Sequence, residues 1–294
     1  MPDREAIREL LMRKGHGRIA DAVVVSLEPS LAIMLEAVES ESEIPLGASK
    51  FGGCADLPTD VNAWPRQGEV EQRFLAQINL ADAAAVWPDV PLPKSGLLSF
   101  FWCQEGDGWS GRAEGRPVGW KVMYSAARPG TLHRLPDPWA QCPARGDGLR
   151  RLLRRKPAPF RRGFAPCRAK FRPMWTISDD PGRPGIEYTD KESDAIFGHL
   201  VEDLNAAGLL SEGHRLLGAA TPVQGSVQHE IEAYVLNPAK PDWDRAEATA
   251  HRWRLLFQVD SDDEPGFAFG DWGNLYFMML ADDLRAQRWD RVEV

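Results

Sequence analysis

The group of residues best suited to chemistry is the acidic run DSDDE at 260–264, followed closely by Asp271. Converging carboxylates are the ligands that Ca²⁺ and Mg²⁺ prefer, and two carboxylates can also act as general acid and base. The spacing does not match an EF-hand, because Gly266 is seventh from Asp260 and the twelfth residue is Asp271 rather than Glu. The other interpretation is a polar turn between two buried strands, whose Asp and Ser side chains satisfy the loop backbone. We favour the polar turn and keep the acid–base or metal hypothesis as its alternative.

The histidines do not form a metal or catalytic motif. The chain has His16, His133, His199, His214, His229 and His251. None belongs to an HExxH sequence, so a zinc hydrolase site is not expected. His229 and Glu230 are adjacent, and neighbours in a strand point to opposite faces, which argues against a catalytic dyad. We expect His214 to make a structural hydrogen bond.

Nucleophile and phosphate motifs do not occur either. The chain lacks Gly-x-Ser-x-Gly, and its four cysteines (Cys54, Cys103, Cys142 and Cys167) form no CxxC pair. We expect the cysteines to be small buried hydrophobic residues. The sequence KFGG at 50–53 lacks the spacing of a phosphate-binding loop, so its glycines are expected to permit a tight turn, and Lys50 is kept as a candidate that faces a ligand. The sequence therefore yields no catalytic residue, no metal-ligand set and no cofactor.

Composition limits the class of protein. The 294 residues are 43% hydrophobic and 27% charged, which excludes wholesale disorder. Asp and Glu number 43 against 35 Lys and Arg, a net charge of -8, which disfavours binding of nucleic acid over the whole surface. No stretch approaches the roughly 18 apolar residues of a membrane helix, and the N-terminus does not resemble a signal peptide. We expect a cytoplasmic protein with no membrane partner.

Short apolar runs separated by 26 Gly and 23 Pro favour strands over helices. Strands are expected at 22–27, 74–80, 97–102, 118–125, 231–236, 253–259 and 275–280. Helices are expected at 3–14 and at 191–207, where apolar residues recur at helical spacing. The segment 31–38 is compatible with either type.

The chain also resembles itself. The sequence FLAQINL at 74–80 matches LLFQVDS at 255–261, and GLLSFFW at 96–102 matches GNLYFMM at 273–279. A glycine segment closed by proline precedes each pair, at 51–58 and 217–222. We therefore predict a β-rich α+β fold with two internally similar strand–loop–strand halves, which arose by duplication, and few helices. Gln77 and Gln258 are equivalent in the two halves and are expected to brace the halves against each other or, alternatively, to line a groove between them.

Between the halves lies a basic segment, residues 145–172, with nine Arg and two Lys against one acid. Its predicted basic patch consists of Arg150, Arg151, Arg154, Arg155, Arg161 and Arg162. Pro and Gly interrupt this segment, so we interpret it as a loop-like insertion. It is a solvated connector, a strap that pairs with the acidic surface of the protein, or an arm that binds RNA, DNA or an acidic protein.

Several segments in order resemble the YwqG-like family of uncharacterised bacterial proteins. They are SKFGG at 49–53, FLAQINL at 74–80, GLLSFF at 96–101, HRLLG at 214–218, WRLLFQVDSD at 253–262 and GDWGNLYF at 270–277. The resemblance implies one α+β domain at 46–294 with internally similar halves, the repeats at about 46–125 and 210–294. We expect an N-terminal helix and strand at 1–45 to pack on this body. It supplies no catalytic residues. Some relatives lie beside toxin systems, which implies an immunity (antitoxin-like) role.

The first functional hypothesis is a non-enzymatic protein-binding module whose acidic surface masks a toxin encoded nearby. The second is a metal-dependent enzyme or small-ligand binder that uses the groove between the repeats, and the third is nucleic-acid binding through the basic segment. The candidate ligand-binding residues are Lys50, Gln77, Asn79, Gln258, Asp260, Asp262, Asp271 and Trp272. Tryptophans in loops could anchor a protein interface, and these are Trp109, Trp120, Trp139 and Trp243.

Overall fold

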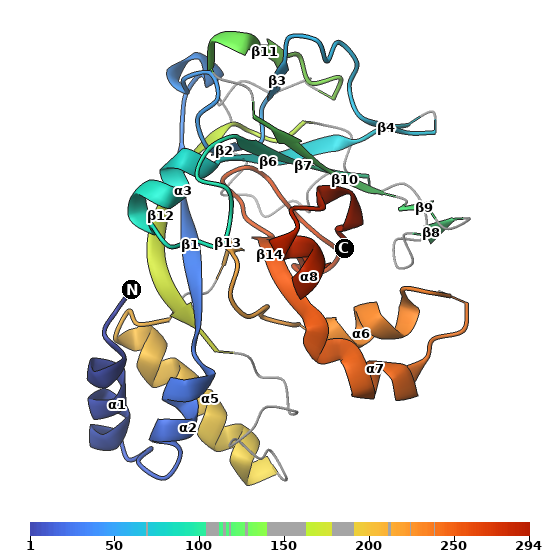
Figure 1. Ribbon diagram of the computed structural model, residues 1–294. Coiled ribbons are helices and arrows are strands. Elements are labelled where there is room, and N and C mark those ends of the chain that lie inside the picture. Colours follow the sequence, from blue (N-terminus) through green and yellow to red (C-terminus); the bar gives the residue numbers. More distant parts are fainter. Residues whose placement is uncertain are drawn as a thin grey trace, which may run out of the picture.

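The computed structural model describes residues 1–68, 70–103, 112–113, 116–117, 119–126, 129–139, 163–177, 191–210, 213–223, 225–237 and 239–294. Within these ranges one large sheet organises the molecule (Figure 1). Its strands are β1 (Glu28–Ala37), β2 (Lys50–Phe51), β6 (Arg73–Asn79), β7 (Leu97–Trp102), β10 (Trp120–Ser125), β12 (Cys167–Thr176), β13 (Arg215–Leu216), β14 (Trp253–Asp260) and β15 (Asn274–Leu280). They pair antiparallel in the order β10-β7-β6-β2-β12-β1-β13-β14-β15.

Shorter elements surround the sheet. Two-stranded sheets pair β3 (Ala55–Pro58) with β11 (Leu132–Leu135), β4 (Arg66–Gln67) with β5 (Val70–Glu71), and β8 (Arg112–Ala113) with β9 (Arg116–Pro117). The α-helices of the described residues are α1 (Arg4–Arg13), α2 (Ala20–Ser26), α3 (Leu80–Val86), α5 (Lys191–Ala206), α6 (Val227–Tyr234), α7 (Trp243–Thr249) and α8 (Ala281–Arg285). Short 3-10 helices are η1 (Glu41–Glu43), η2 (Pro129–Thr131), η3 (Ala250–Arg252) and η4 (Trp289–Arg291). The predicted β-dominated α+β class is confirmed. None of the described helices has the length and apolar character needed to cross a bilayer.

The order of equivalent strands is symmetric about the centre of the sheet. The series β7-β6-β2-β12 on one side corresponds to β15-β14-β13-β1 on the other. Lys50 pairs with Gln77 between β2 and β6, and Arg215 pairs with Gln258 between β13 and β14. The registers of β6 and β14 both shift at the equivalent residue, Leu75 or its counterpart Leu256. The structure thus contains the two similar halves that the sequence predicts.

The two halves exchange a strand. The strand β1 precedes the first half in the chain but pairs with β13 of the second half, whereas β12 precedes the second half but pairs with β2 of the first. These two ten-residue strands also pair with each other along their whole length, from Glu28 opposite Thr176 to Ala37 opposite Cys167. The halves therefore share one continuous sheet.

The sheet curls so that its two ends meet over an aromatic core. The ring of Phe100 on β7 lies 4.3 Å from that of Phe257 on β14 and 5.1 Å from that of Phe277 on β15 (centroid distances). The C-terminal residues close the remaining gap, because Glu293 exchanges backbone hydrogen bonds with Met278 on β15. On the other side Trp120 Nε1 of β10 donates to the Val292 carbonyl at 2.9 Å.

A second, smaller core lies at one end of β1 and β12, where α1, α2 and α5 gather (Figure 1). In α1, Asp3 caps the N-terminus and the buried residues Ile7 and Leu11 are four apart, which gives the helix one apolar face. Leu200 and Leu204 of α5 pack against this face. The helices predicted at 3–14 and 191–207 are confirmed.

The prediction of strands at 22–27 and 231–236 is wrong, since these residues lie in or beside α2 and α6. Both segments contain β-branched residues, which favour strands only where a partner strand is available. Val23 and Leu27, which are four residues apart, are instead buried in the smaller core with α1 and α5. In α6 the side chain of Ser226 caps the N-terminus, and Ile231 packs toward β14.

The other predicted strands are confirmed as β6, β7, β10, β14 and β15, with ends that differ by up to two residues. The undecided segment 31–38 lies mainly in β1. The interpretation of 145–172 as an insertion is wrong for its last six residues, which form part of β12 at the centre of the sheet. There Cys167 and Ala169 are buried while Lys170 is exposed, a two-residue alternation that the high positive charge obscured.

Candidate functional site

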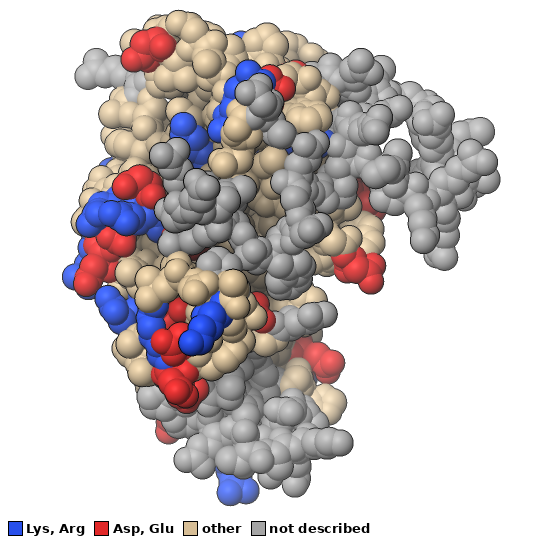
Figure 2. All heavy atoms as spheres, turned by 90° about the vertical axis from the view of Figure 1, so that its right-hand side faces the viewer, with Lys and Arg blue, Asp and Glu red and all other residues tan. Residues whose placement is uncertain are grey.

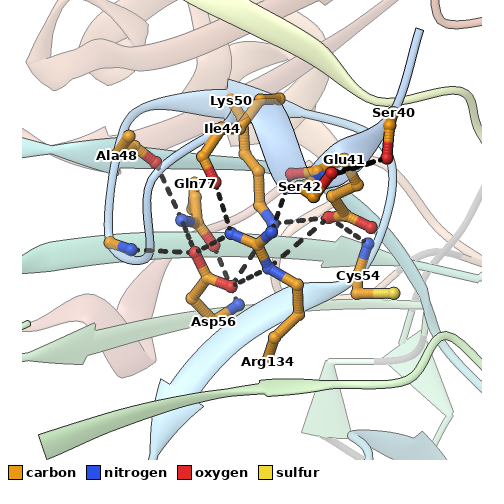
Figure 3. A network of polar contacts seen from close by, with 11 residues as sticks. Ser40, Glu41, Ser42, Ile44, Ala48, Lys50, Cys54, Asp56, Gln77 and Arg134 are labelled. Atoms are coloured by element: carbon orange, nitrogen blue, oxygen red, sulfur yellow. Dashed lines mark hydrogen bonds and ion pairs between the residues drawn. The ribbon is translucent and has the colours of Figure 1, made fainter. Parts of the chain in front are cut away.

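A buried polar network joins the first half of the sheet to the small β3–β11 sheet (Figure 3). The Lys50 side chain is fully buried, and its Nζ lies 2.7 Å from Glu41 Oε1 and 3.4 Å from Asp56 Oδ1. Glu41 Oε1 also accepts a hydrogen bond from the Cys54 backbone nitrogen at 2.8 Å. At Gly53, whose φ is +69°, an added Cβ would lie 2.5 Å from the same oxygen, so glycine is required there.

Arg134 of β11 completes the network from the neighbouring strand. It stands directly opposite Asp56 in the β3–β11 register. Its Nε and Nη2 bind the two Asp56 oxygens at 2.7 and 3.2 Å, a bidentate pair. Its Nη1 and Nη2 also donate to the carbonyls of Glu41 and Ile44 at 2.8 and 3.0 Å. One guanidinium thus ties β3, β11 and the η1 turn together.

Gln77 supplies the remaining hydrogen bonds. Its Oε1 accepts from the Asp56 backbone nitrogen at 2.9 Å, and its Nε2 donates to Asp56 Oδ2 at 2.9 Å and to the Ala48 carbonyl at 2.8 Å. Gln77 therefore joins the segment before β2 to strand β3, within its own half. The prediction that this glutamine braces one half against the other is wrong.

The charged groups of the network are paired with one another, as expected of a structural role and not of acid–base catalysis. Burial raises the pKa of Asp56, but the hydrogen bond from Arg134 and the charge of Lys50 lower it by more, so the net pKa lies below its ordinary value. Burial also raises the pKa of the nearby Cys54 thiol to about 11, which keeps it protonated at neutral pH. Each carboxylate has a cationic partner, so neither is poised as a general base.

The second half repeats this arrangement with different residues. Gln258 Oε1 accepts from the Thr221 backbone nitrogen at 3.0 Å, as Gln77 does from Asp56. Arg215, 2% exposed, takes the place of Lys50 and donates to the carbonyls of Gly213 and Ala219. Because Thr221 stands where the first half has Asp56, the second half lacks a buried carboxylate at that position.

The acidic run after β14 is divided among separate partners. Asp260 Oδ1 accepts from Gln258 Nε2 at 2.8 Å, and Asp262 Oδ2 lies 3.0 Å from His214 Nε2. The hydrogen bond with His214 is the main reason that the pKa of Asp262 is lowered. His214 Nδ1 accepts from the Asp260 backbone nitrogen, so Nε2 carries the proton and both ring nitrogens are used. The predicted structural role of His214 is confirmed.

The described residues contain no group of three His, Cys, Asp or Glu side chains placed to hold a metal ion. Asp262 Oδ1 accepts from the Glu264 backbone nitrogen at 2.7 Å, and Ser261 Oγ donates to the Gly273 carbonyl at 2.8 Å. These are the contacts of a polar turn, the interpretation favoured from the sequence. Asp271 is exposed and does not join Asp260 and Asp262 in such a group.

Trp272 is the outstanding feature of this turn. Its backbone has φ +63°, a left-handed conformation that residues with a Cβ rarely adopt, and the residue is 59% exposed. The backbone on either side is fixed, because Gly273 donates to the Phe269 carbonyl at 2.6 Å and Phe269 donates to Ser261 Oγ at 2.9 Å. The turn therefore holds an indole ring in solvent.

The structure does not bring the eight predicted ligand residues together at one site, and Asp262 pairs with His214. Lys50 and Gln77 meet in the first network, Gln258 and Asp260 meet in the second, and Asp271 and Trp272 lie on the exposed turn. Asn79 instead caps the N-terminus of α3, where its side chain accepts from the Ala81 nitrogen. The predicted basic patch lies outside the described residues, and its members are Arg150, Arg151, Arg154, Arg155, Arg161 and Arg162.

The sequence analysis missed Glu41, Asp56 and Arg134, which come from three segments with no shared motif. The prediction that Trp120 lies in a loop is wrong, since it is buried in β10. Trp139 stacks on Arg73 with 4.5 Å between the guanidinium carbon and the ring centroid. Trp243 is 51% exposed, and Trp109 lies outside the described residues.

Comparison with known proteins places this arrangement in a family. The family model described as a domain of unknown function, DUF1963, matches residues 49–294. This range includes Gln77, Gln258 and Trp272, whereas Glu41 and Ala48 of the first network precede it. No curated protein sequence matches the chain. The chain belongs to the DUF1963 family, a domain of unknown function.

Proposed function

We propose that this protein is a non-enzymatic binding module that recognises a basic protein partner through the Trp272 turn, residues 261–273. The observation that carries the proposal is the exposed indole of Trp272 on a left-handed backbone. A residue other than glycine in this conformation costs about 1–2 kcal/mol, and glycine would avoid the cost. A tryptophan in this conformation is explained if its exposed side chain binds a partner.

The turn is suited to an interface anchor because it is rigid. Phe267 and Phe269 are buried in the main core, and the hydrogen bonds of Ser261 and Gly273 fix the intervening backbone. A backbone that is already ordered loses little conformational entropy on binding. Tryptophan is also the residue type most enriched among the residues that dominate binding energy.

The charge of the turn indicates the chemistry of the partner. Residues 261–273 contain four acids and no Lys or Arg. Three of the acids, Asp263, Glu264 and Asp271, are exposed. Such a surface attracts a positively charged partner and speeds its association at low salt. The partner is therefore expected to present an apolar pocket for the indole with basic residues around it.

We also propose that the protein is not an enzyme. The buried charged side chains of Lys50, Asp56 and Arg134 support this, because they already bind each other. Both nitrogens of His214 are engaged as well. A metal-dependent reaction at Asp260, Asp262 and Asp271 has less support, since each carboxylate lies in a different local environment.

The specific form of this function that we favour is immunity: a YwqG-like, bacterial, cytoplasmic protein that masks a basic nuclease-like toxin. It rests on the sequence segments that resemble that family and on the acidic turn. Nucleic-acid binding is less favoured, because the described end of the basic segment is paired within the protein: Lys170 and Arg168 lie 2.7 and 3.6 Å from Glu36. On the face drawn in Figure 2, the described Lys and Arg side chains are interspersed with Asp and Glu.

The test is affinity capture from the source cells with the full chain and two variants, followed by quantitative mass spectrometry. We expect one basic protein at near-stoichiometric yield, lost from Trp272→Ala and retained by Trp243→Ala, which removes an equally large exposed ring from α7. Binding of the purified pair is expected to weaken as salt rises. Capture that does not depend on Trp272, an acidic partner, or self-association through Trp272 detected by light scattering would contradict the proposal.

A further inference from the structure

A pocket of about 450 Å³ opens beside the buried network of the first half. It lies among β3, β7 and β10 and the segments that follow β3 and β10. Its lining consists of Asp56, Leu57, Pro58, Thr59, Asp60, Val61, Ser99, Met123, Tyr124, Ser125, Ala126 and Thr131. This volume is within the range of sites for small molecules, roughly 300–1,000 Å³.

At the wall of this pocket lies the hydroxyl group of Ser99, which makes no hydrogen bond within the part of the chain that the structure describes. Ser99 on β7 is 2% exposed and stands between Gln77 on β6 and Met123 on β10. Among the described residues no hydrogen-bond partner of Ser99 Oγ occurs, whereas its neighbour Gln77 is saturated. A buried polar group is normally satisfied by protein, water or ligand. A ligand in the pocket would satisfy Ser99.

The network keeps the wall of the pocket in place. Asp56 is one of the lining residues, and its carboxylate is held by Arg134 and Gln77. Thr59 donates its backbone N–H to the Thr131 carbonyl at 3.0 Å, which joins the two segments that follow β3 and precede β11. The pocket is therefore formed before any ligand enters, so that binding does not require ordering of its wall.

The lining defines the ligand by charge and polarity. It contains two carboxylates and no Lys, Arg or His, and the Asp56 carboxylate is already used by Arg134. Asp60 is exposed and remains the charged group at the pocket. Hydroxyl side chains come from Thr59, Ser99, Tyr124, Ser125 and Thr131, with Leu57, Val61 and Met123 among them. A lining that mixes hydroxyl and apolar groups suits a small ring that carries hydroxyls and C–H faces.

We infer that this pocket binds a small polyhydroxylated molecule, of monosaccharide size, that is uncharged or carries an ammonium group. Phosphorylated and carboxylated molecules are excluded, since Asp60 repels them and no cation in the lining compensates. This site is separate from the Trp272 turn and does not depend on the proposed partner.

Saturation-transfer NMR tests the inference with D-glucose, D-glucosamine and D-glucose 6-phosphate as probes. We expect signals from the first two sugars and none from the phosphate. Ser99→Val should weaken binding of both sugars at least tenfold, whereas Ser26→Val on α2 should leave it unchanged. Because a core variant can fail to fold, Asp60→Lys provides the second test at an exposed position. It should weaken glucosamine at least fivefold and leave glucose unaffected.

Each contrary result overturns the inference. Absence of a signal from glucose and glucosamine with the wild-type chain would do so, as would a phosphate signal of equal strength. Folded Ser99→Val with unchanged binding, or Asp60→Lys with unchanged preference for glucosamine, would place the sugars elsewhere on the protein.

Discussion

Gln77 and Gln258 hold the same position in the two halves of one sheet. Each amide oxygen accepts a hydrogen bond from a backbone nitrogen of the segment that follows the short strand β2 or β13, at 2.9 Å from Asp56 in β3 and at 3.0 Å from Thr221. Each amide nitrogen also points to the carbonyl two residues before that short strand, of Ala48 at 2.8 Å or of Gly213 at 3.5 Å. The repeat therefore conserves a hydrogen-bonding device as well as a strand order.

The first prediction concerns these glutamines. Gln77→Leu leaves the Asp56 backbone nitrogen and the Ala48 carbonyl unpaired in the core, so the free energy of unfolding should fall by about 2–4 kcal/mol. Gln258→Leu should cost about 1–3 kcal/mol, because its contact with Gly213 is longer. Urea unfolding followed by tryptophan fluorescence measures both values. Equal stability of the Gln77→Leu variant and the wild type would show that the segments at Ala48 and Asp56 do not depend on this amide.

The second prediction concerns pH. The pKa of Asp56 is lower in the folded protein than its ordinary value, so its charged form stabilises the fold at neutral pH. That stabilisation is present above the unfolded-state pKa, near 4, and is lost as the pH falls through the folded-state pKa. Asp56→Asn should be less stable than the wild type at pH 7 and should lose less stability between pH 5 and pH 2.5.

Urea midpoints from pH 2.5 to pH 7 test this difference. Asp56→Asn at neutral pH leaves Lys50 and Arg134 short of a negative partner, and breaking a buried pair costs about 3–5 kcal/mol. Glu71→Gln at the exposed β4–β5 hairpin is the control, since its ion pair with Arg66 is on the surface. If the urea midpoints of the wild type and of Asp56→Asn fell equally with pH, this carboxylate would have no role in acid stability.

The third prediction concerns Cys54. Burial raises the pKa of its thiol to about 11, so on the order of 0.1% is thiolate at pH 8. Iodoacetamide at pH 8 should therefore alkylate Cys54 at least a hundredfold more slowly than free cysteine in the same solution. Peptide mass spectrometry of a time course gives the rate. A rate close to that of free cysteine would mean that the loop between Gly53 and Asp56 is open.

These residues show how far the sequence leads. The strands β6, β7, β14 and β15 are predictable because each is a largely apolar run between turn residues. Gln77 and Gln258 were recognisable because an amide inside such a run is unusual. In contrast, Glu41 and Arg134 carry no local signal: each is an ordinary charged residue in a polar segment, and only the pairing of β3 with β11 brings them together.

Three errors have physical causes. The β-branched residues of α2 and α6 were interpreted as strands, although helical packing against α5 and β14 decides their structure. The alternation in β12 was hidden by Arg168 and Lys170, which point outward and pair with Glu36. The partners of the glutamines could not be predicted, because a sequence does not show which loop folds over which strand.

The fourth prediction concerns closure of the sheet. Deleting residues 292–294 removes the acceptor of Trp120 Nε1 and the backbone pair between Met278 and Glu293. It also uncovers the aromatic core beneath Val292, which is 3% exposed. We expect a loss of about 3–5 kcal/mol in unfolding free energy and a red shift of tryptophan fluorescence. Val294→Ala, which keeps the backbone pairing, should cost less than about 1 kcal/mol, and equal effects of the two changes would contradict the closure.

The last prediction separates the function of Trp272 from its contribution to the fold. Glycine adopts the left-handed backbone at φ +63° without strain, so Trp272→Gly should unfold at the same or a higher temperature than the wild type. An anchor residue of an interface contributes about 2 kcal/mol or more, which corresponds to roughly thirtyfold in affinity. The variant should therefore be at least as stable and bind at least thirtyfold more weakly.

The most direct measurement is calorimetric titration of the purified basic partner into the wild-type protein and into Trp272→Gly, with Trp243→Ala as the control. The account predicts the loss of affinity only in Trp272→Gly, with its thermal stability retained. Equal affinities of the wild type and Trp272→Gly would contradict the account, because the exposed indole would then have no part in recognition.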